Sequence, residues 1–108
     1  MRNYNFYVYI VTNKNKSVLY IGVTNNLSRR LSEHENKVNP GFTARYNCHY
    51  LVYYDQFQYI NDAIAREKSL KGLLRSKKDK LISDFNPDWK FLNKKFDNNL
   101  PYELLRIT

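Results

Sequence analysis

The chain has 108 residues, of which 43% are apolar and 16% aromatic, and it carries a formal net charge of +8. This composition excludes a compositionally disordered chain and favours one compact domain with its own core. So strong a positive charge on a short chain favours a polyanionic partner, with nucleic acid ahead of a membrane surface. A basic domain without such a partner is the alternative that charge alone leaves open.

Cysteine content and hydropathy exclude further classes. Cys48 is the only cysteine, so the chain can form neither an intrachain disulfide nor a zinc site with CxxC spacing. The apolar run near the N-terminus is too short and too rich in tyrosine for a signal peptide. No run approaches the length of a membrane span. These features predict a cytoplasmic protein with a reduced thiol.

The first half of the chain predicts a β-hairpin followed by a helix. Residues 6–12 and 18–24 are rich in β-branched and aromatic residues, which favour strands, and a short polar turn joins them. Neither strand alternates strictly between apolar and polar residues, so both faces are expected to be at least partly covered. Residues 24–26 can cap a helix that begins near Leu27. One face of this helix is expected to carry Leu27, Leu31, His34 and Val38.

The second half predicts a strand and two helices. Residues 38–47 contain proline and glycine and are expected to form a loop, and residues 48–57 predict a third strand. Asn61 or Asp62 can cap a helix over residues 63–76, which Gly72 weakens, so we expect a break before a shorter helix at residues 76–85. The apolar stripe of the longer helix consists of Ile60, Ala63, Ile64, Leu70 and Leu74.

The order β-β-α-β-α-α predicts an α+β fold. No segment between the first two strands is long enough for a crossover helix, so we expect a small three-stranded antiparallel sheet flanked by helices. Residues 1–92 are expected to form this domain, and residues 93–108 a C-terminal extension. Trp89, Phe91 and Leu92 are too apolar for a solvated tail and are expected to dock on the core.

Three polar side chains occupy or border the apolar stripes. Glu67 falls within the stripe of the second helix, where a carboxylate must be paired, protonated or bound to a metal. A salt bridge to Lys71 or to an arginine is its structural alternative. Arg30 and His34 border the stripe of the first helix. The alternatives for them are a snorkelling arginine and a hydrogen-bonded structural histidine.

Taken together, these residues suit phosphodiester hydrolysis better than each does alone. A carboxylate can hold a divalent cation that neutralises phosphate charge and polarises water. A guanidinium matches phosphate oxygens in charge and planar geometry. A phenol or an imidazole can relay a proton. The sequence offers Glu67, Arg30, His34 and two strand-borne tyrosines, Tyr9 and Tyr20.

The same residues stand in motifs that resemble a known family. Two tripeptides, residues 7–9 (YVY) and 20–22 (YIG), are followed by Arg30 ten residues after Tyr20 and by His34 one turn later. The segments AREKSLKG and NPDWKFL complete the pattern. It resembles the GIY-YIG endonuclease family over roughly residues 6–89, in particular its small stand-alone bacterial members. It is also similar to the nuclease domain of the excision-repair incision subunit.

The resemblance implies a role for each site residue. Tyr9 would orient the attacking water, Tyr20 would act as the general base or its partner, and His34 would assist proton transfer. Arg30 would stabilise the transition state, and Glu67 would hold one Mg²⁺ or Mn²⁺. Which of the two tyrosines and the histidine is the base stays open. Gly22 would let the backbone turn closely beside Tyr20.

The expected activity is endonucleolytic cleavage of DNA, rather than RNA, with low sequence specificity by a monomer. It would nick duplex or branched DNA, or cut single strands. A non-catalytic nucleic-acid-binding module on the same fold is the alternative. No motif supports a small-molecule enzyme. Residues that would contact the phosphate backbone are Arg29, Lys37, Arg45, Arg66, Lys71, Lys77 and Lys78. Tyrosines that would stack on unpaired bases, or else pack in the sheet, are Tyr46, Tyr50, Tyr53 and Tyr54.

Overall fold

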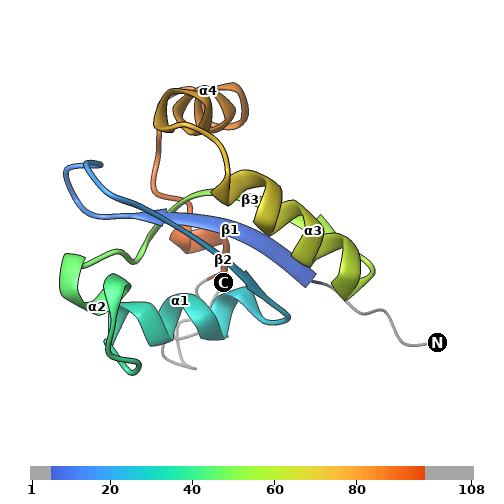
Figure 1. Ribbon diagram of the computed structural model, residues 1–108. Coiled ribbons are helices and arrows are strands. Elements are labelled where there is room, and N and C mark those ends of the chain that lie inside the picture. The colour runs from blue at the N-terminus through green and yellow to red at the C-terminus, as the bar shows by residue number, and fades with distance from the viewer. Residues whose placement is uncertain (1–5, 97–108) are drawn as a thin grey trace, which may run out of the picture.

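The computed structural model describes residues 6–96 and shows a three-stranded sheet with helices on both faces (Figure 1). This confirms the predicted α+β class. The elements are β1 (Phe6–Thr12), β2 (Leu19–Thr24), α1 (Leu27–Glu35), α2 (Phe42–Tyr46), β3 (Tyr50–Phe57), α3 (Ile60–Lys71), α4 (Arg75–Phe85) and a 3-10 turn, η1 (Asn93–Phe96). None of the helices in this range is long and apolar enough to cross a membrane.

The sheet is antiparallel, with β1 at its centre in the order β2-β1-β3. Successive side chains of a strand point to opposite faces, so β1 contributes to two cores. Val8 and Ile10 belong to the core under α3 and α4, while Tyr9 and Val11 belong to the core under α1. Both faces of the central strand are therefore covered, as its lack of strict alternation predicts.

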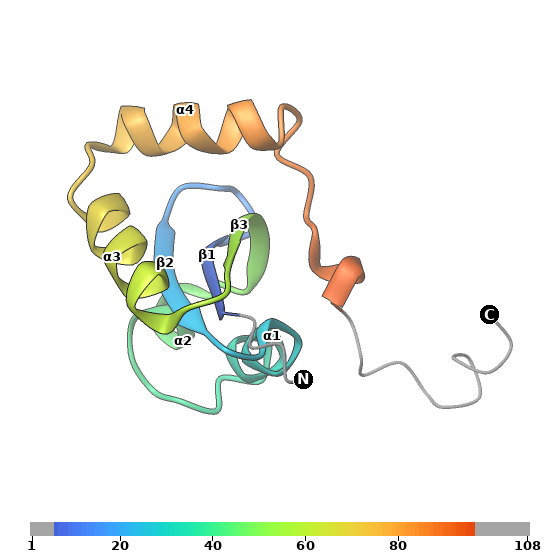
Figure 2. The same ribbon diagram turned by 90° about the vertical axis from the view of Figure 1, so that its right-hand side faces the viewer.

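The helices form two layers, which the two perpendicular views separate (Figures 1 and 2). Helix α4 lies above the sheet and α1 below it in both views, and α3 runs beside the strands. Ala63 and Leu70 of α3 and Ile82 of α4 are fully buried in the upper core. Leu27 and Leu31 of α1 fill the lower one. Residues that could serve the chemistry of the site thus come from both layers.

Helix α1 ends earlier than its apolar pattern predicts. Asn36 caps its C-terminus, with the side-chain amide donating to the Ser32 carbonyl at 2.9 Å, and Lys37 has a left-handed φ of 53°. Val38 is therefore outside the helix and 60% exposed, so its placement on the buried face is wrong. The predicted loop also contains a helical turn, α2.

Helix α3 begins before its predicted cap. Tyr59 is the N-cap, and its carbonyl accepts the first helical hydrogen bond from Ala63, so neither Asn61 nor Asp62 caps the helix. Gly72 forms the C-cap, which confirms the break, and α4 follows. Leu74 precedes α4 in extended conformation and is 71% exposed, and Ile60 is 40% exposed. These two residues are not part of the inward stripe.

The segment after α4 docks on the core as predicted for Trp89 and Leu92, whereas Phe91 belongs to neither core and is 38% exposed, stacked on Tyr50. Trp89 packs against the upper core, and Leu92 and Phe96 pack against the lower one. Asn93 accepts a hydrogen bond from the Leu51 backbone at 2.8 Å and donates one to the His49 carbonyl at 2.8 Å. Contacts with the sheet therefore continue to residue 96, so the expected domain boundary at residue 92 stays a prediction. Residues 97–108 of the extension lie outside the described residues.

Candidate active site

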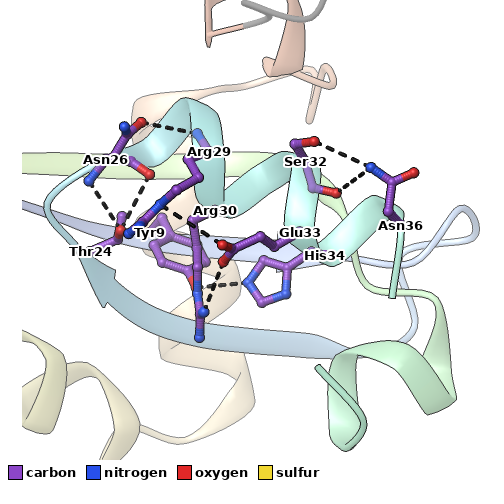
Figure 3. Close-up of polar contacts among 9 residues, drawn as sticks. All are labelled: Tyr9, Thr24, Asn26, Arg29, Arg30, Ser32, Glu33, His34 and Asn36. Atoms are coloured by element: carbon purple, nitrogen blue, oxygen red, sulfur yellow. Dashed lines mark hydrogen bonds and ion pairs between the residues drawn. The ribbon is translucent and has the colours of Figure 1, made fainter. Parts of the chain in front are cut away.

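The candidate site is centred on Tyr9, whose side chain points from β1 toward α1 (Figure 3). Leu27 and Leu31 pack in the same core as Tyr9, and this packing holds α1 against the strand. On the helix, Arg30 and His34 lie one turn apart and both reach the Tyr9 hydroxyl. A buried tyrosine hydroxyl needs partners, and this one has two.

The polarity of the hydrogen bonds follows from the donors available. Arg30 Nε lies 3.3 Å from the Tyr9 oxygen and can only donate, so the hydroxyl accepts there. Its own hydrogen is then directed to His34 Nε2, at 2.8 Å. A neutral imidazole that accepts at Nε2 carries its hydrogen on Nδ1, which lies 3.1 Å from Thr43 Oγ1. The result is a four-residue chain of hydrogen bonds from Arg30 to Thr43.

The electrostatics agree with this polarity. Burial raises the pKa of Tyr9 to about 12, an effect that Arg30 partly offsets. Burial, reinforced by the positive charge of Arg30, lowers the pKa of His34 to about 4. At neutral pH the phenol is therefore protonated and the imidazole is neutral. His34 can accept a proton in this state, whereas Tyr9 releases one only when a base takes it.

Gly22 makes room for Tyr9. The two residues are partners across the β1–β2 ladder, and a Cβ atom on Gly22 would lie 2.5 Å from Tyr9 Cζ and still closer to its hydroxyl. Gly22 lies inside β2 and not in a turn, so the expected turn beside Tyr20 is wrong. The physical reason for glycine here is the close approach of the Tyr9 ring.

Tyr20 is the partly exposed tyrosine of the pair. Its ring lies 6.5 Å from that of Tyr9 and 5.7 Å from that of His34, centre to centre. Tyr9, in contrast, has no exposed surface. Of the two phenols, Tyr20 is thus the one that solvent or a substrate can reach without a rearrangement.

Glu67 lies on α3, in the other layer. Its side chain is 17% exposed and pairs with Lys71 at 3.2 Å, which is the structural alternative that the sequence left open for it. The carboxylate is near enough for its charge to contribute to the raised pKa of Tyr9. Between residues 6 and 96, no group of three or more His, Cys, Asp or Glu side chains could hold a metal ion. A single carboxylate still suits Mg²⁺, which protein sites commonly hold through one or two carboxylates, waters and substrate phosphates.

Two of the predicted phosphate-contacting residues lie in a groove beside Tyr20. The groove crosses the outer edge of β2 and is lined by Leu19, Tyr20, Ile21, Phe42, Lys71 and Lys78. Arg29 lines a second groove, together with Arg30, at the opposite end of β2. Lysines from α3 and α4 thus reach the same surface as the tyrosine from β2.

The other predicted contacts are more dispersed. Arg45 lies over the Tyr46 ring at 5.5 Å, and Lys37 and Lys77 are exposed. Arg66 pairs with Asp55 of β3 at 3.8 Å, on the far side of β1 from β2. Each of these four residues remains a prediction, because none of them lines the groove beside Tyr20.

Three residues of this site are not among those predicted from the sequence. Thr43 receives the His34 hydrogen bond, Phe42 stacks on Tyr20 with ring centres 6.1 Å apart, and Glu33 accepts from Arg30 Nη1 at 3.2 Å. Glu33 could have been found from its helical spacing, three residues after Arg30. Phe42 and Thr43 lie in a segment whose proline and glycine predict a loop.

Residues 5–80 match the family model described as the GIY-YIG catalytic domain. The chain belongs to the GIY-YIG family. The match includes every residue of the hydrogen-bonded chain as well as Tyr20 and Glu67. Membership supports a nuclease-type function, which has a nucleic acid as its substrate.

Relatives and a solved structure are similar over most of the chain. A UPF0213 protein of Clostridium perfringens is 40% identical over 77 residues, which cover 71% of this chain and 82% of the relative. A UPF0213 protein of Natronomonas pharaonis is 33% identical over 78 residues, covering 72% and 91%. The solution NMR structure of a UPF0213 protein from Bacillus halodurans is 30% identical, with a TM-score of 0.47, covering 89% of this chain and 96% of that one.

Proposed function

We propose that this protein is a metal-dependent endonuclease that hydrolyses phosphodiester bonds in DNA with low sequence specificity. One Mg²⁺ or Mn²⁺ would be held through Glu67. The observation that carries the proposal is the hydrogen-bonded chain Arg30–Tyr9–His34 beside the accessible Tyr20. It brings a phosphate-binding cation, a neutral base and a solvent-accessible phenol to one place.

Arg30 is the proposed phosphate ligand. Its guanidinium donates through Nε to Tyr9 and through Nη1 to Glu33, and its side chain is 30% exposed. A guanidinium has five N–H donors, so these two contacts orient the group and leave other donors for phosphate oxygens. Donors fixed in advance stabilise the charge that develops on the phosphoryl oxygens.

Tyr20 and His34 are the proposed proton-transfer groups. Tyr20 contacts the water that attacks phosphorus, because its ring borders the groove while Tyr9 is buried. His34 is neutral near pH 7, and its Nε2 accepts the hydrogen of the Tyr9 hydroxyl, so a proton could reach His34 at this atom only through Tyr9. The hydroxyl of Tyr9 fixes the positions of the Arg30 and His34 side chains through its hydrogen bonds to both.

Glu67 is the proposed metal ligand. When bound there, the cation supplies charge neutralisation at the phosphate and polarises a water molecule. In the free protein the carboxylate forms an ion pair with Lys71, whose Nζ lies 3.2 Å from Glu67 Oε2. Because the lysine also lines the groove, it can transfer to a phosphate oxygen when the carboxylate changes partner.

A cleavage assay with Mg²⁺ or Mn²⁺ tests the proposal. Supercoiled plasmid and a labelled single-stranded oligonucleotide are incubated with the wild type and with Glu67→Gln. We expect metal-dependent products that the variant does not give, although it still binds the oligonucleotide. Asp84→Asn is the matched control, since Asp84 also pairs with a lysine one turn away, Lys80 at 3.1 Å, but on the exposed surface of α4. Cleavage that survives Glu67→Gln, or no cleavage of either substrate, contradicts the proposal.

A non-catalytic nucleic-acid-binding module is the second candidate. The Glu67–Lys71 ion pair favours it, because that pair alone accounts for the carboxylate. This candidate predicts salt-sensitive binding with no effect of metal ions. The same assay, supplemented with EDTA, separates the two functions.

A further inference from the structure

Helix α2 is fixed in orientation beside the candidate site. At its start, Gly41 has φ 139° and ψ −153°, a conformation that is essentially restricted to glycine, and Asn47 ends the helix at φ 58°. Between them, Thr43 is buried and contacts His34 Nδ1 at 3.1 Å. The five-residue helix is therefore anchored to the hydrogen-bonded chain through its inner face.

The outer face of α2 is aromatic and exposed. Phe42 and Tyr46 are one turn apart, with ring centres separated by 4.8 Å, and they are 45% and 40% exposed. Phe42 also stacks on Tyr20 with an angle of 27° between the ring planes. A continuous aromatic surface thus extends from the accessible tyrosine of the site to Tyr46. We call these three residues the aromatic platform.

Three basic side chains lie beside the platform. Lys71 and Lys78 line the same groove as Tyr20 and Phe42, and Arg45 lies over the Tyr46 ring. An apolar peptide would leave these cations without partners. A nucleic-acid strand fits both features, because bases stack on aromatic rings while the phosphates meet the cations. In a perfect duplex the flat faces of the bases are covered by their neighbours, so the rings can reach only an unpaired base.

We propose that Phe42 and Tyr46 form a base-stacking subsite that holds an unpaired nucleobase of the strand being cut. Lys71 and Lys78 contact phosphates of the same strand, and Tyr20 lies between the stacked base and the scissile phosphate. This inference rests on the proposed nuclease function and adds its substrate class. The preferred substrate is a strand with unpaired bases at the cut, and not a perfect duplex.

The test measures binding without cleavage. Glu67→Gln protein in EDTA is titrated against a fluorescein-labelled single-stranded oligonucleotide and against the same strand in a duplex, with anisotropy as the readout. Phe42→Leu and Tyr46→Leu, added separately to this background, keep apolar volume but remove the aromatic ring. We expect the single-strand Kd to rise about 5-fold or more in each variant, with the duplex Kd unchanged.

Phe91→Leu is the matched control. Phe91 is 38% exposed, stacks on Tyr50 with ring centres 4.3 Å apart and lies 5.3 Å from the Lys16 ammonium. Tyr50 belongs to β3, so this pair is at the other edge of the sheet. We expect the control to bind both oligonucleotides within about 2-fold of the parent protein. Thermal melts establish that every variant is folded at the assay temperature.

The possible outcomes separate this proposal from the nuclease function. Unchanged single-strand binding in both leucine variants overturns the subsite, even if the wild type cleaves DNA. An equal loss of affinity for the single strand and the duplex also overturns it. So does an apolar peptide that binds tightly to the parent protein and to both leucine variants. A selective loss of single-strand affinity supports the subsite even if the wild type proves unable to cleave, and only the nuclease proposal then fails.

Discussion

The Tyr9 ring lies directly against the backbone of Gly22, in space that any side chain at position 22 would fill. Gly22→Ala is therefore expected to push Tyr9 away from Arg30 and His34. Overpacking of this kind costs about 1–3 kcal/mol of unfolding free energy. We expect thermal denaturation to show this loss and the cleavage assay to show a loss of activity.

Gly72→Ala is the control for that substitution. A Cβ atom at Gly72 meets nothing nearer than the Ser69 carbonyl at 3.7 Å, and φ is −81°, which alanine adopts freely. This change is expected to leave activity intact and to raise stability by about 0.4–1 kcal/mol through the unfolded state. Equal melting temperatures for the two alanine variants would contradict the proposed packing role of Gly22.

The lowered pKa of His34 predicts a pH-dependent stability. Between pH 6.5 and about 4 the unfolded chain binds a proton at this position that the folded chain does not bind. The stabilisation is therefore fully present above pH 6.5 and is lost as the pH is lowered toward 4, by about 3 kcal/mol. Urea denaturation at several pH values measures this slope. Burial also lowers the pKa of His49, the other histidine, so His34→Gln and His49→Gln are compared, and the first is expected to flatten the slope more.

Thr43 is expected to act as a positioning residue for His34. Thr43→Val removes the acceptor of the Nδ1 hydrogen bond, so the tautomer that is protonated at Nδ1 and unprotonated at Nε2 loses its support. We expect kcat for cleavage to fall about 10-fold and its pH profile to shift, while KM changes little. Thr43→Ser retains the hydroxyl and should restore both. A purely structural role would change the melting temperature without moving the pH profile.

Arg30 and Arg29 offer a comparison between adjacent arginines of one helix. Arg30→Lys keeps the charge but loses the Nε donor to Tyr9 and the planar fork, and is expected to lower kcat about 100-fold. Arg29 is more exposed, and its only ion pair is with Glu33 at 3.9 Å within the described part of the chain. Arg29→Lys should therefore leave kcat almost unchanged. Single-turnover rates of both variants would decide, and equal losses would refute a specific role for Arg30.

Lys71 is expected to compete with the metal ion for Glu67. Lys71→Gln removes the ammonium group 3.2 Å from the carboxylate, so Mn²⁺ should bind about 2- to 5-fold more tightly in the absence of DNA. Electron paramagnetic resonance of free Mn²⁺ during a titration gives this affinity directly. Lys80→Gln, which breaks an equivalent pair on α4, is expected to have no effect. Weaker Mn²⁺ binding in Lys71→Gln would show that the lysine supports the metal site.

Much of the fold was predictable because local patterns and tertiary packing agree. The three strands, the hairpin and the break at Gly72 follow from residue type and spacing, and the structure confirms them. The salt bridge of Glu67 with Lys71 was also open to prediction, since helical spacing brings such side chains together. These features depend on neighbours close in sequence.

Long-range contacts account for what the sequence did not show. Helix α2 has only five residues. The hydrogen bond between its Thr43 and His34 joins two segments that no sequence periodicity relates. The family resemblance implied that Gly22 lets the backbone turn beside Tyr20, whereas the reason for glycine is the ring of Tyr9 on the neighbouring strand. Helix α1 ends where Lys37 takes a left-handed φ of 53°, while both the backbone and the side-chain amide of Asn36 donate to the Ser32 carbonyl.

The position of β2 at the edge of the sheet restricts how this protein can assemble with others. The groove that holds Tyr20, Lys71 and Lys78 crosses the outer side of this strand. Strand addition to an open sheet edge is a common route to dimers and peptide complexes. At β2 an added strand would fill the groove, so sheet extension on that side would exclude substrate from the site proposed there. An assembly that keeps the groove accessible must use another surface, and a peptide that pairs with β2 would act as an inhibitor.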